Sequence, residues 1–252
     1  MMFSIIIPVF NRPDEINELL ESLTLQDFSC LFEVIIVEDG SATLCKDIVN
    51  QYLGQLNLKY FYKENSGPGD SRNFGMQKAT GDYFIIFDSD CIIPPKFLQE
   101  VNDFLNNQFY HCFGGPDAAD DSFSDVQKAI DFSMTSVLTT GGLRGKSESI
   151  QKFQPRSFNM GLSREAFEKT GGFGNIHPGE DPELIFKLWR LGYETALIKK
   201  AIVYHKRRIN WKKFFTQINK FGKVRPILNQ RFPEYVKPTF WFPTIFMLGL
   251  FG

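Results

Sequence analysis

The first half of the chain alternates short apolar runs with segments of helical periodicity. Four apolar runs have the length of buried strands, at residues 3–10, 33–38, 58–63 and 83–87. Pro13 favours the first turn of a helix. After it, apolar residues recur at helical spacing, at Ile16, Leu19, Leu20 and Leu23. Strands that alternate with helices predict an α/β fold with a mostly parallel sheet and helices on both faces.

The second half is less regular. We expect a strand at residues 154–162, a short helix at 164–169, a helix at 180–191 and a last strand at 202–205. Residues 120–145 predict a helix followed by a mobile loop rich in Gly, Thr and Ser. No repeat or linker interrupts the pattern. We therefore predict one domain over residues 1–210, with halves 1–115 and 116–210, and a separate segment, 211–252.

The end of the predicted domain and the separate segment together combine basic and apolar residues. Residues 195–233 contain eleven Lys or Arg and no Asp or Glu, and residues 238–252 carry no charge. Such an order is typical of a segment at the cytoplasmic face of a membrane, and the first residues of the chain lack the basic region of a signal peptide. A bilayer span needs about 20 apolar residues, so the uncharged stretch predicts an interfacial anchor or a truncated span. The alternative is a solvent-facing basic helix with an apolar tail docked on the core.

Composition narrows the class of protein. Hydrophobic residues make up 43% of the chain and charged residues 23%, which is ordinary for a globular protein and excludes disorder or coiled coil as the main state. A formal net charge of −1 gives no overall balance for binding nucleic acid, and we expect no nucleic-acid partner. The cysteines lie far apart without a CxxC pair, which argues against a disulfide framework or a structural zinc site and fits a reducing compartment.

Acidic residues follow two of the predicted strands, where ligands of open α/β sheets bind. Asp88 and Asp90 flank Ser89 after the run 83–87, and two neighbouring carboxylates suit a hard divalent cation such as Mg²⁺ or Mn²⁺. Asp39 precedes Gly40 and could accept a hydrogen bond from a base or ribose. A solvated turn explains either motif without any ligand.

Other candidates are weaker. Residues 65–73 resemble a dinucleotide-binding loop but place Arg72 where the third glycine belongs, and Thr140 stands where a phosphate-binding loop ending at residues 145–147 requires glycine. Arg72 instead offers a cationic fork for a base edge or a phosphate. Asp181 and Glu180 open a predicted helix, where they suit either a catalytic base or simple complementarity to the helix dipole. His205 could complete a metal shell, although a lone histidine is more often structural.

Taken in order, these motifs resemble a known family. Residues 4–11, 37–41, 65–75, 88–90, 171–173 and 179–181 are together similar to the inverting family 2 glycosyltransferases with the GT-A fold. The resemblance covers about residues 3–210. It implies a Rossmann-like, mostly parallel central sheet flanked by helices, with a smaller mixed region on the acceptor side.

The resemblance also implies roles for particular residues. Asp181 would be the general base and Asp90 the ligand of a divalent metal, Mn²⁺ or Mg²⁺, with His205 as a second ligand. A nucleotide-diphospho-sugar donor, by default a UDP-sugar, would be lined by Pro8, Asp39, Arg72 and Asp88. A saccharide or lipid-linked acceptor would lie beside Asn159, Gly161 and Glu180.

The implied reaction adds one sugar in the synthesis of a cell-surface polysaccharide or glycolipid. The Gln-x-x-Arg-Trp signature of processive synthases is absent from the sequence. Gly174 and Asn175 stand where the family often has an acid, which leaves the acceptor side open. Two alternatives remain: a sugar-nucleotide pyrophosphorylase, which would want a glycine-rich basic loop where Asn11 and Arg12 stand, and a non-catalytic module that binds sugar or membrane.

Overall fold

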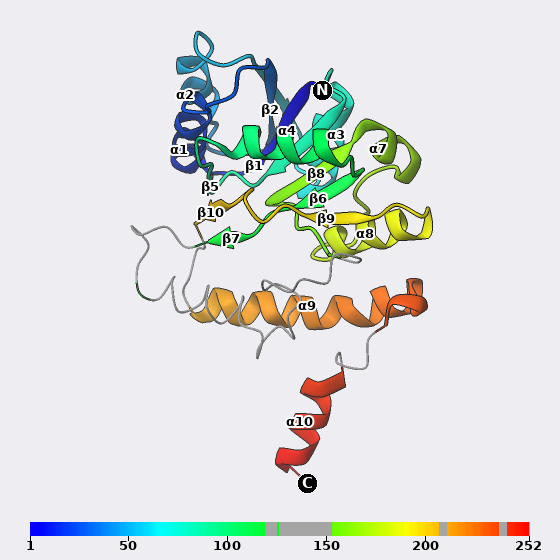
Figure 1. Cartoon of the computed structure of the whole chain (residues 1–252). Helices are drawn as coiled ribbons and strands as arrows, with labels where there is room; N and C mark the ends of the chain where they lie inside the picture. The colour runs from blue at the N-terminus through cyan, green and yellow to red at the C-terminus, as the bar shows by residue number, and fades with distance from the viewer. Residues whose placement is uncertain (119–124, 126–152, 207–210, 237–240, 252) are drawn as a thin grey trace.

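The computed structural model describes residues 1–118, 125, 153–206, 211–236 and 241–251. The helix and loop predicted at residues 120–145, and the rejected phosphate-loop motif at 145–147, lie outside these ranges. Among the described residues, a seven-stranded sheet forms the centre of the fold (Figure 1). In spatial order its strands are β3 (Leu58–Lys63), β2 (Phe32–Asp39), β1 (Phe3–Val9), β4 (Tyr83–Phe87), β8 (Asn159–Ser163), β6 (Cys112–Gly114) and β9 (Thr195–Leu197).

The sheet is mostly parallel, as predicted. Strands β1 to β4 run parallel to one another, whereas β8 runs antiparallel to both β4 and β6. Because β8 lies between β4 and β6, both predicted halves of the domain contribute strands to one sheet. The predicted strand 154–162 was too long: Pro155 offers no N–H, and the Asn159 N–H donates to the Arg156 carbonyl in a turn before β8 begins.

Helices cover both faces of the sheet because alternate side chains of each strand point to opposite sides. Ile5 and Ile7 pack with α1 (Pro13–Thr24), α2 (Lys46–Gln51) and α4 (Phe97–Asn107). Ile6 points to the other face, which is covered by α3 (Pro68–Lys78), α7 (Arg164–Thr170) and α8 (Glu180–Arg190).

A small second sheet contains the strand predicted at residues 202–205, but the pairing of that strand was not predicted. It pairs β10 (Val203–His205) with β5 (Cys91–Ile92) on one side and β7 (Asp117–Ala118) on the other. Its other strands, β5 and β7, have two residues each, which is too few for periodicity to indicate a strand in the sequence. Its register sets His205 opposite Cys91, directly after Asp90.

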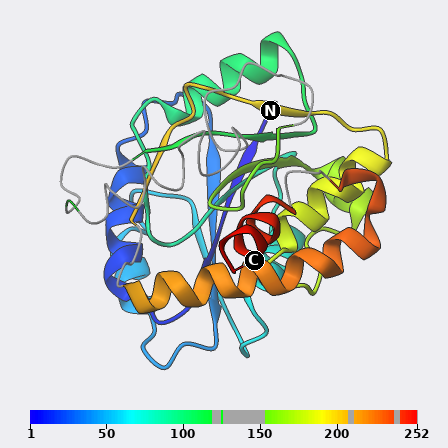
Figure 2. The ribbon, with the colours of Figure 1, turned by 90° about the horizontal axis from the view of Figure 1, so that it is seen from below.

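The C-terminal segment lies outside the two sheets. Helix α9 (Trp211–Arg231) crosses beneath the domain and is followed by a short 3-10 helix, Pro233–Tyr235 (Figure 2). Val224 and Leu228 anchor α9 in a cluster with Ile176 and Phe186.

Helix α10 (Phe242–Phe251) extends away from the domain (Figure 1). Its Ile245 and Leu248 are 61% and 71% exposed, so these side chains do not dock on the core. No helix among the described residues combines the length and apolar character needed to cross a bilayer.

Candidate active site

Asp39 ends β2 and organises the loop that leads into α3. Its carboxylate accepts hydrogen bonds from the backbone N–H groups of Ser66 and Gly67, both at 3.0 Å, and from Lys63 Nζ at 2.5 Å. Gly67 has φ +96°, a conformation that favours glycine. Asp39 therefore fixes the backbone at the start of α3, and one turn later this helix carries Arg72 toward the carboxyl ends of the strands.

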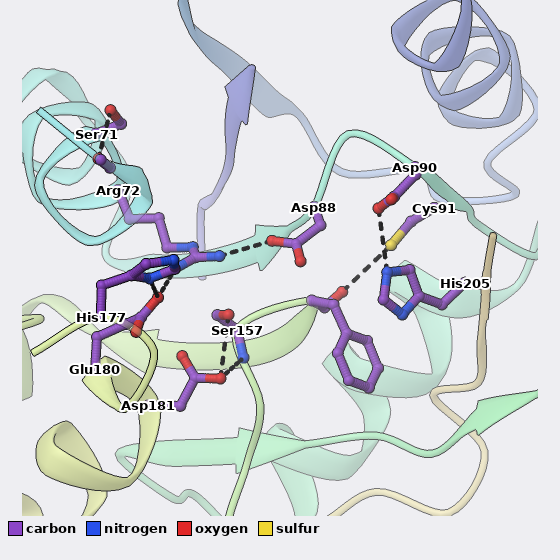
Figure 3. Close-up of polar contacts among 12 residues, drawn as sticks. Ser71, Arg72, Asp88, Asp90, Cys91, Ser157, His177, Glu180, Asp181 and His205 are labelled. Atoms are coloured by element: carbon purple, nitrogen blue, oxygen red, sulfur yellow. Dashed lines mark hydrogen bonds and ion pairs between the residues drawn. The ribbon is translucent and has the colours of Figure 1, made fainter. Parts of the chain in front are cut away.

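Arg72 joins two acidic segments that lie far apart in the sequence. Its guanidinium is 4% exposed and bonds Asp88 Oδ1 at 2.7 Å through Nη2 and Glu180 Oε1 at 3.4 Å through Nη1 (Figure 3). Burial by itself would lower the pKa of Arg72, but the charges of Asp88, Asp181 and Glu180 outweigh it and raise that pKa. The structure thus brings together Arg72, Asp88, Glu180 and Asp181, as the sequence analysis anticipated for a single site.

Glu180 is held as a carboxylate. Burial would raise the pKa of Glu180, yet a hydrogen bond from His177 and the charge of Arg72 lower it to about 2. His177 Nδ1 lies 3.1 Å from Glu180 Oε1. Glu180 is thus committed to internal partners in the structure, and its predicted acceptor contact stays a prediction.

Asp181 differs from Glu180 in both its hydrogen bonding and the direction of its pKa shift. Its Oδ2 accepts from the N–H and the hydroxyl of Ser157 at 3.1 and 3.2 Å, whereas its buried Oδ1 has no hydrogen-bond partner among the described residues (Figure 3). Burial raises the pKa of Asp181, even though Arg72 counteracts the effect. A fixed carboxylate with one uncommitted oxygen and a raised pKa suits a general base.

Asp90 belongs to a second cluster beside the first. Its Oδ2 pairs with Arg12, and its Oδ1 lies 3.1 Å from His205 Nε2. Burial would raise the pKa of Asp90, but His205 and Arg12 lower it to about 2. The structure therefore brings together Asp90 and His205, the two residues predicted to hold a metal.

The chemistry of this cluster fits a divalent cation. Potential ligand atoms of Asp90, Cys91 and His205 lie within 4.8 Å of one another. A carboxylate and an imidazole are acceptable ligands for Mn²⁺, whereas Mg²⁺ prefers oxygen alone. Cys91 is a poorer candidate, because burial raises the pKa of its thiol well above the usual value and its Sγ lies 3.7 Å from the Phe158 carbonyl, to which the thiol donates.

The remaining predicted residues, Pro8, Asn159 and Gly161, belong to strands of the central sheet. Pro8 is partly buried near the end of β1. Asn159 is 1% exposed and donates to the Ala201 carbonyl at 2.8 Å, and a Cβ at Gly161 would clash with the Phe113 ring. Asn159 therefore ties β8 to the loop before β10, and Gly161 leaves room for Phe113 of β6. Contact of either residue with an acceptor stays a prediction.

Four residues of the two clusters escaped the sequence analysis: Arg12, Cys91, Ser157 and His177. Arg12 could have been found, since it follows the first predicted strand at the edge where Asp39 and Asp88 also lie. Ser157 and His177 reach the site through irregular loops, for which the sequence offers no periodic signal.

The chain matches a family model. The model described as "Glycosyl transferase family 2" matches residues 4–171, two thirds of the chain. The matched range contains Asp39, Arg72, Asp88 and Asp90 and ends before Glu180 and Asp181.

Curated relatives are similar in sequence to part of this chain. A poly(ribitol-phosphate) beta-N-acetylglucosaminyltransferase, TarS of Staphylococcus aureus, is 38% identical over 109 residues, which are 42% of this chain and 19% of TarS. An uncharacterized glycosyltransferase of Haemophilus influenzae is 30% identical over 195 residues, covering 74% of this chain and 62% of that protein. The match thus spans only a fifth of TarS and less than two thirds of the Haemophilus protein.

Solved structures share the fold. The structure of S. aureus TarS 1–349 in complex with UDP-GlcNAc superposes with a TM-score of 0.64 at 24% identity, over 83% of this chain and 60% of that one. The mannosyltransferase PcManGT of Pyrobaculum calidifontis, in complex with GDP-Man and Mn²⁺, gives a TM-score of 0.68 at 18% identity, over 87% and 60%. These likenesses confirm the predicted GT-A fold.

Proposed function

Because the chain belongs to glycosyl transferase family 2, we propose that it transfers a single sugar from a nucleotide-diphospho-sugar to an acceptor hydroxyl, with inversion at the anomeric carbon. The observation that carries the proposal is the convergence of Asp88, Glu180 and Asp181 on the buried guanidinium of Arg72. Family membership argues against the pyrophosphorylase alternative, and the experiments below separate a transferase from a non-catalytic module.

Asp181 acts as the general base in this proposal. Its uncommitted Oδ1 takes the proton of the acceptor hydroxyl while the hydroxyl oxygen attacks the anomeric carbon. The bond between that carbon and the diphosphate oxygen breaks on the opposite side, and the nucleoside diphosphate leaves. One base suffices because no covalent intermediate forms. Ser157 keeps the carboxylate oriented through its N–H and hydroxyl.

The donor occupies the carboxyl ends of β1, β2 and β4. Pro8, the Asp39-organised loop and Arg72 line the base and ribose, and Asp88 faces the ribose or the sugar. We take uridine as the default base. The complexes of TarS with UDP-GlcNAc and of PcManGT with GDP-Man are consistent with either nucleotide on this fold. Asp90 and His205 would hold a divalent metal, Mn²⁺ rather than Mg²⁺, whose charge offsets that of the leaving diphosphate.

The acceptor is a saccharide or a lipid-linked sugar used to build a cell-surface polysaccharide or glycolipid. TarS, as its name states, acts on poly(ribitol-phosphate), which supports an envelope acceptor. We propose that the enzyme works at the cytoplasmic face of a membrane. Phe215 and Ile218 of α9 are 71% and 51% exposed, and the nearby Lys220 and Lys223 offer charge to anionic headgroups.

A donor screen tests the function directly. Thermal unfolding is followed with UDP-, GDP- and dTDP-sugars, each with Mn²⁺ and without metal. A ligand at 100 times its Kd stabilises by about 2.7 kcal/mol, which gives an easily measured rise in Tm. One nucleotide-sugar should raise Tm in the presence of Mn²⁺, and the same mixture should release nucleoside diphosphate. Stabilisation without any turnover under all metals would favour the non-catalytic module, and no stabilisation would contradict the proposal.

A further inference from the structure

The backbone at Arg12 is fixed at the edge of the sheet where the donor is proposed to bind. It lies between β1 and α1, next to Asn11, whose φ is +53°. The Asn11 side chain accepts from the N–H groups of Ala42 and Thr43 at 2.8 and 3.2 Å, and its own N–H donates to Ser41 Oγ at 2.8 Å. The backbone from which the Arg12 side chain extends is therefore fixed by the loop after β2.

The Arg12 guanidinium competes for the carboxylate that is proposed to bind the metal. Arg12 Nη1 pairs with Asp90 Oδ2, while His205 approaches Oδ1 from the other side. A second ion pair, between Lys206 and Glu18, ties β10 to α1 and keeps these groups together. Both oxygens of Asp90 thus have partners within the protein. A divalent cation that uses Oδ2 has to displace Arg12.

We propose that Arg12 is an exchange residue, which neutralises Asp90 in the metal-free protein and moves to the donor's diphosphate when a divalent cation takes Asp90. This inference rests on the proposed function. The Arg12 side chain is 27% exposed, so it has solvent on one side into which it can rotate. A guanidinium fork matches phosphate oxygens as well as it matches a carboxylate. Arg12 therefore binds the donor only after a metal has taken its place at Asp90.

The exchange predicts two effects of opposite sign for Arg12→Gln. Isothermal titration with Mn²⁺ alone should show an affinity about tenfold higher than in the wild type, because the competing cation is gone. Titration with UDP at saturating Mn²⁺ should show an affinity about tenfold lower, because the diphosphate loses its partner. Arg12→Lys keeps the charge but lacks the planar fork of the guanidinium. Its affinities for Mn²⁺ and for UDP should both lie between those of the wild type and those of Arg12→Gln.

Lys206→Gln is the matched control. It removes one positive charge from the same cluster but leaves the Asp90 carboxylate with Arg12. Its Mn²⁺ affinity should stay within about twofold of the wild type, so a general effect of charge is separated from direct competition. Thermal unfolding of each variant without ligand shows that it is folded.

The outcomes separate the two proposals. If the wild type binds Mn²⁺ and UDP but Arg12→Gln binds Mn²⁺ no more tightly, the exchange is wrong and the proposed function stands. A tighter Mn²⁺ site with unchanged UDP affinity also contradicts the exchange. If the wild type binds neither Mn²⁺ nor any nucleoside diphosphate, the proposed function and the exchange fail together.

Discussion

Two acidic side chains at opposite ends of the central sheet are held in opposite ways. Glu33, at the start of β2, accepts from Lys59 Nζ at 2.7 Å, Ser4 Oγ at 2.6 Å and the Thr80 N–H at 2.5 Å. Asp181, at the other end, accepts from Ser157 alone among the described residues and leaves Oδ1 without a partner. The satisfied carboxylate stabilises the fold, whereas the unsatisfied one is available for chemistry.

Their pKa values shift in opposite directions. Burial would raise the pKa of Glu33, but the hydrogen bonds from Lys59, Ser4 and Thr80 lower it to about 2. Burial raises the pKa of Asp181. The folded state therefore favours ionised Glu33 and disfavours ionised Asp181. A functional site that lowers stability in this way is expected where a protein has to keep a reactive group.

The largest effect is expected at Arg72, the counterion of the active-site carboxylates. Arg72→Gln leaves Asp88, Glu180 and Asp181 without that charge, and loss of one partner of a buried ion pair costs about 3–5 kcal/mol. Urea denaturation should show this loss, and Arg72→Lys should recover part of it. A free energy of unfolding equal to that of the wild type would show that Arg72 does not hold the three acids together.

Glu33→Gln and Asp181→Asn test the contrast between the two ends. Glu33→Gln breaks a satisfied network and should lower the free energy of unfolding by about 1–3 kcal/mol, with donor affinity unchanged. Asp181→Asn removes a carboxylate whose charge is disfavoured and should unfold at the same urea concentration as the wild type or a higher one. Equal destabilisation by both variants would contradict the comparison.

The pH dependence sharpens the same contrast. Glu33 has a lowered folded pKa, so its contribution to stability is present above pH 4.5 and is lost as pH falls toward about 2. Asp181 has a raised pKa, so its contribution is present at low pH and is lost as pH rises through the folded value. As the pH falls from 5 to about 3, the free energy of unfolding should therefore decrease more for the wild type than for Glu33→Gln. Parallel stability curves for the two proteins would rule out this role of Glu33.

The smallest effect is expected on α9. Phe215→Ser should reduce binding to vesicles that contain anionic lipid by about three- to tenfold, since it removes one apolar side chain from the proposed membrane contact. Leu31→Ser is the control, because Leu31 is also an exposed apolar side chain but belongs to the loop just before β2 and not to α9. Cosedimentation with vesicles measures both variants. Equal binding by wild type and Phe215→Ser would remove α9 from the contact.

The sequence predicted the parts of the fold that periodicity encodes. The apolar runs located β1 to β4, and helical periodicity or the Gly and Pro residues at their starts located the helices between them. It missed β5, β6, β7 and β9, because two- and three-residue strands are defined by their neighbours rather than by their own residues, although it did predict β10 as the strand at residues 202–205.

The candidate site was predictable where polar residues follow a strand, and less so elsewhere. Asp39, Asp88 and Asp90 were found in this way. Arg72 was expected at a base or a phosphate, whereas in the structure it pairs with acids that the chain supplies 16 and 108 residues later. Ion pairs over such separations depend on the tertiary fold and cannot be predicted from the local sequence.

The role of Asp181 is tested most directly by comparing Asp181→Asn with the wild type. Release of nucleoside diphosphate is measured from the donor that the thermal screen selects, alongside donor affinity by titration. Turnover should fall by about 10²–10⁴-fold, the usual contribution of a general base, while donor affinity should stay within about twofold. Turnover close to that of the wild type would contradict the assignment of Asp181 as the base.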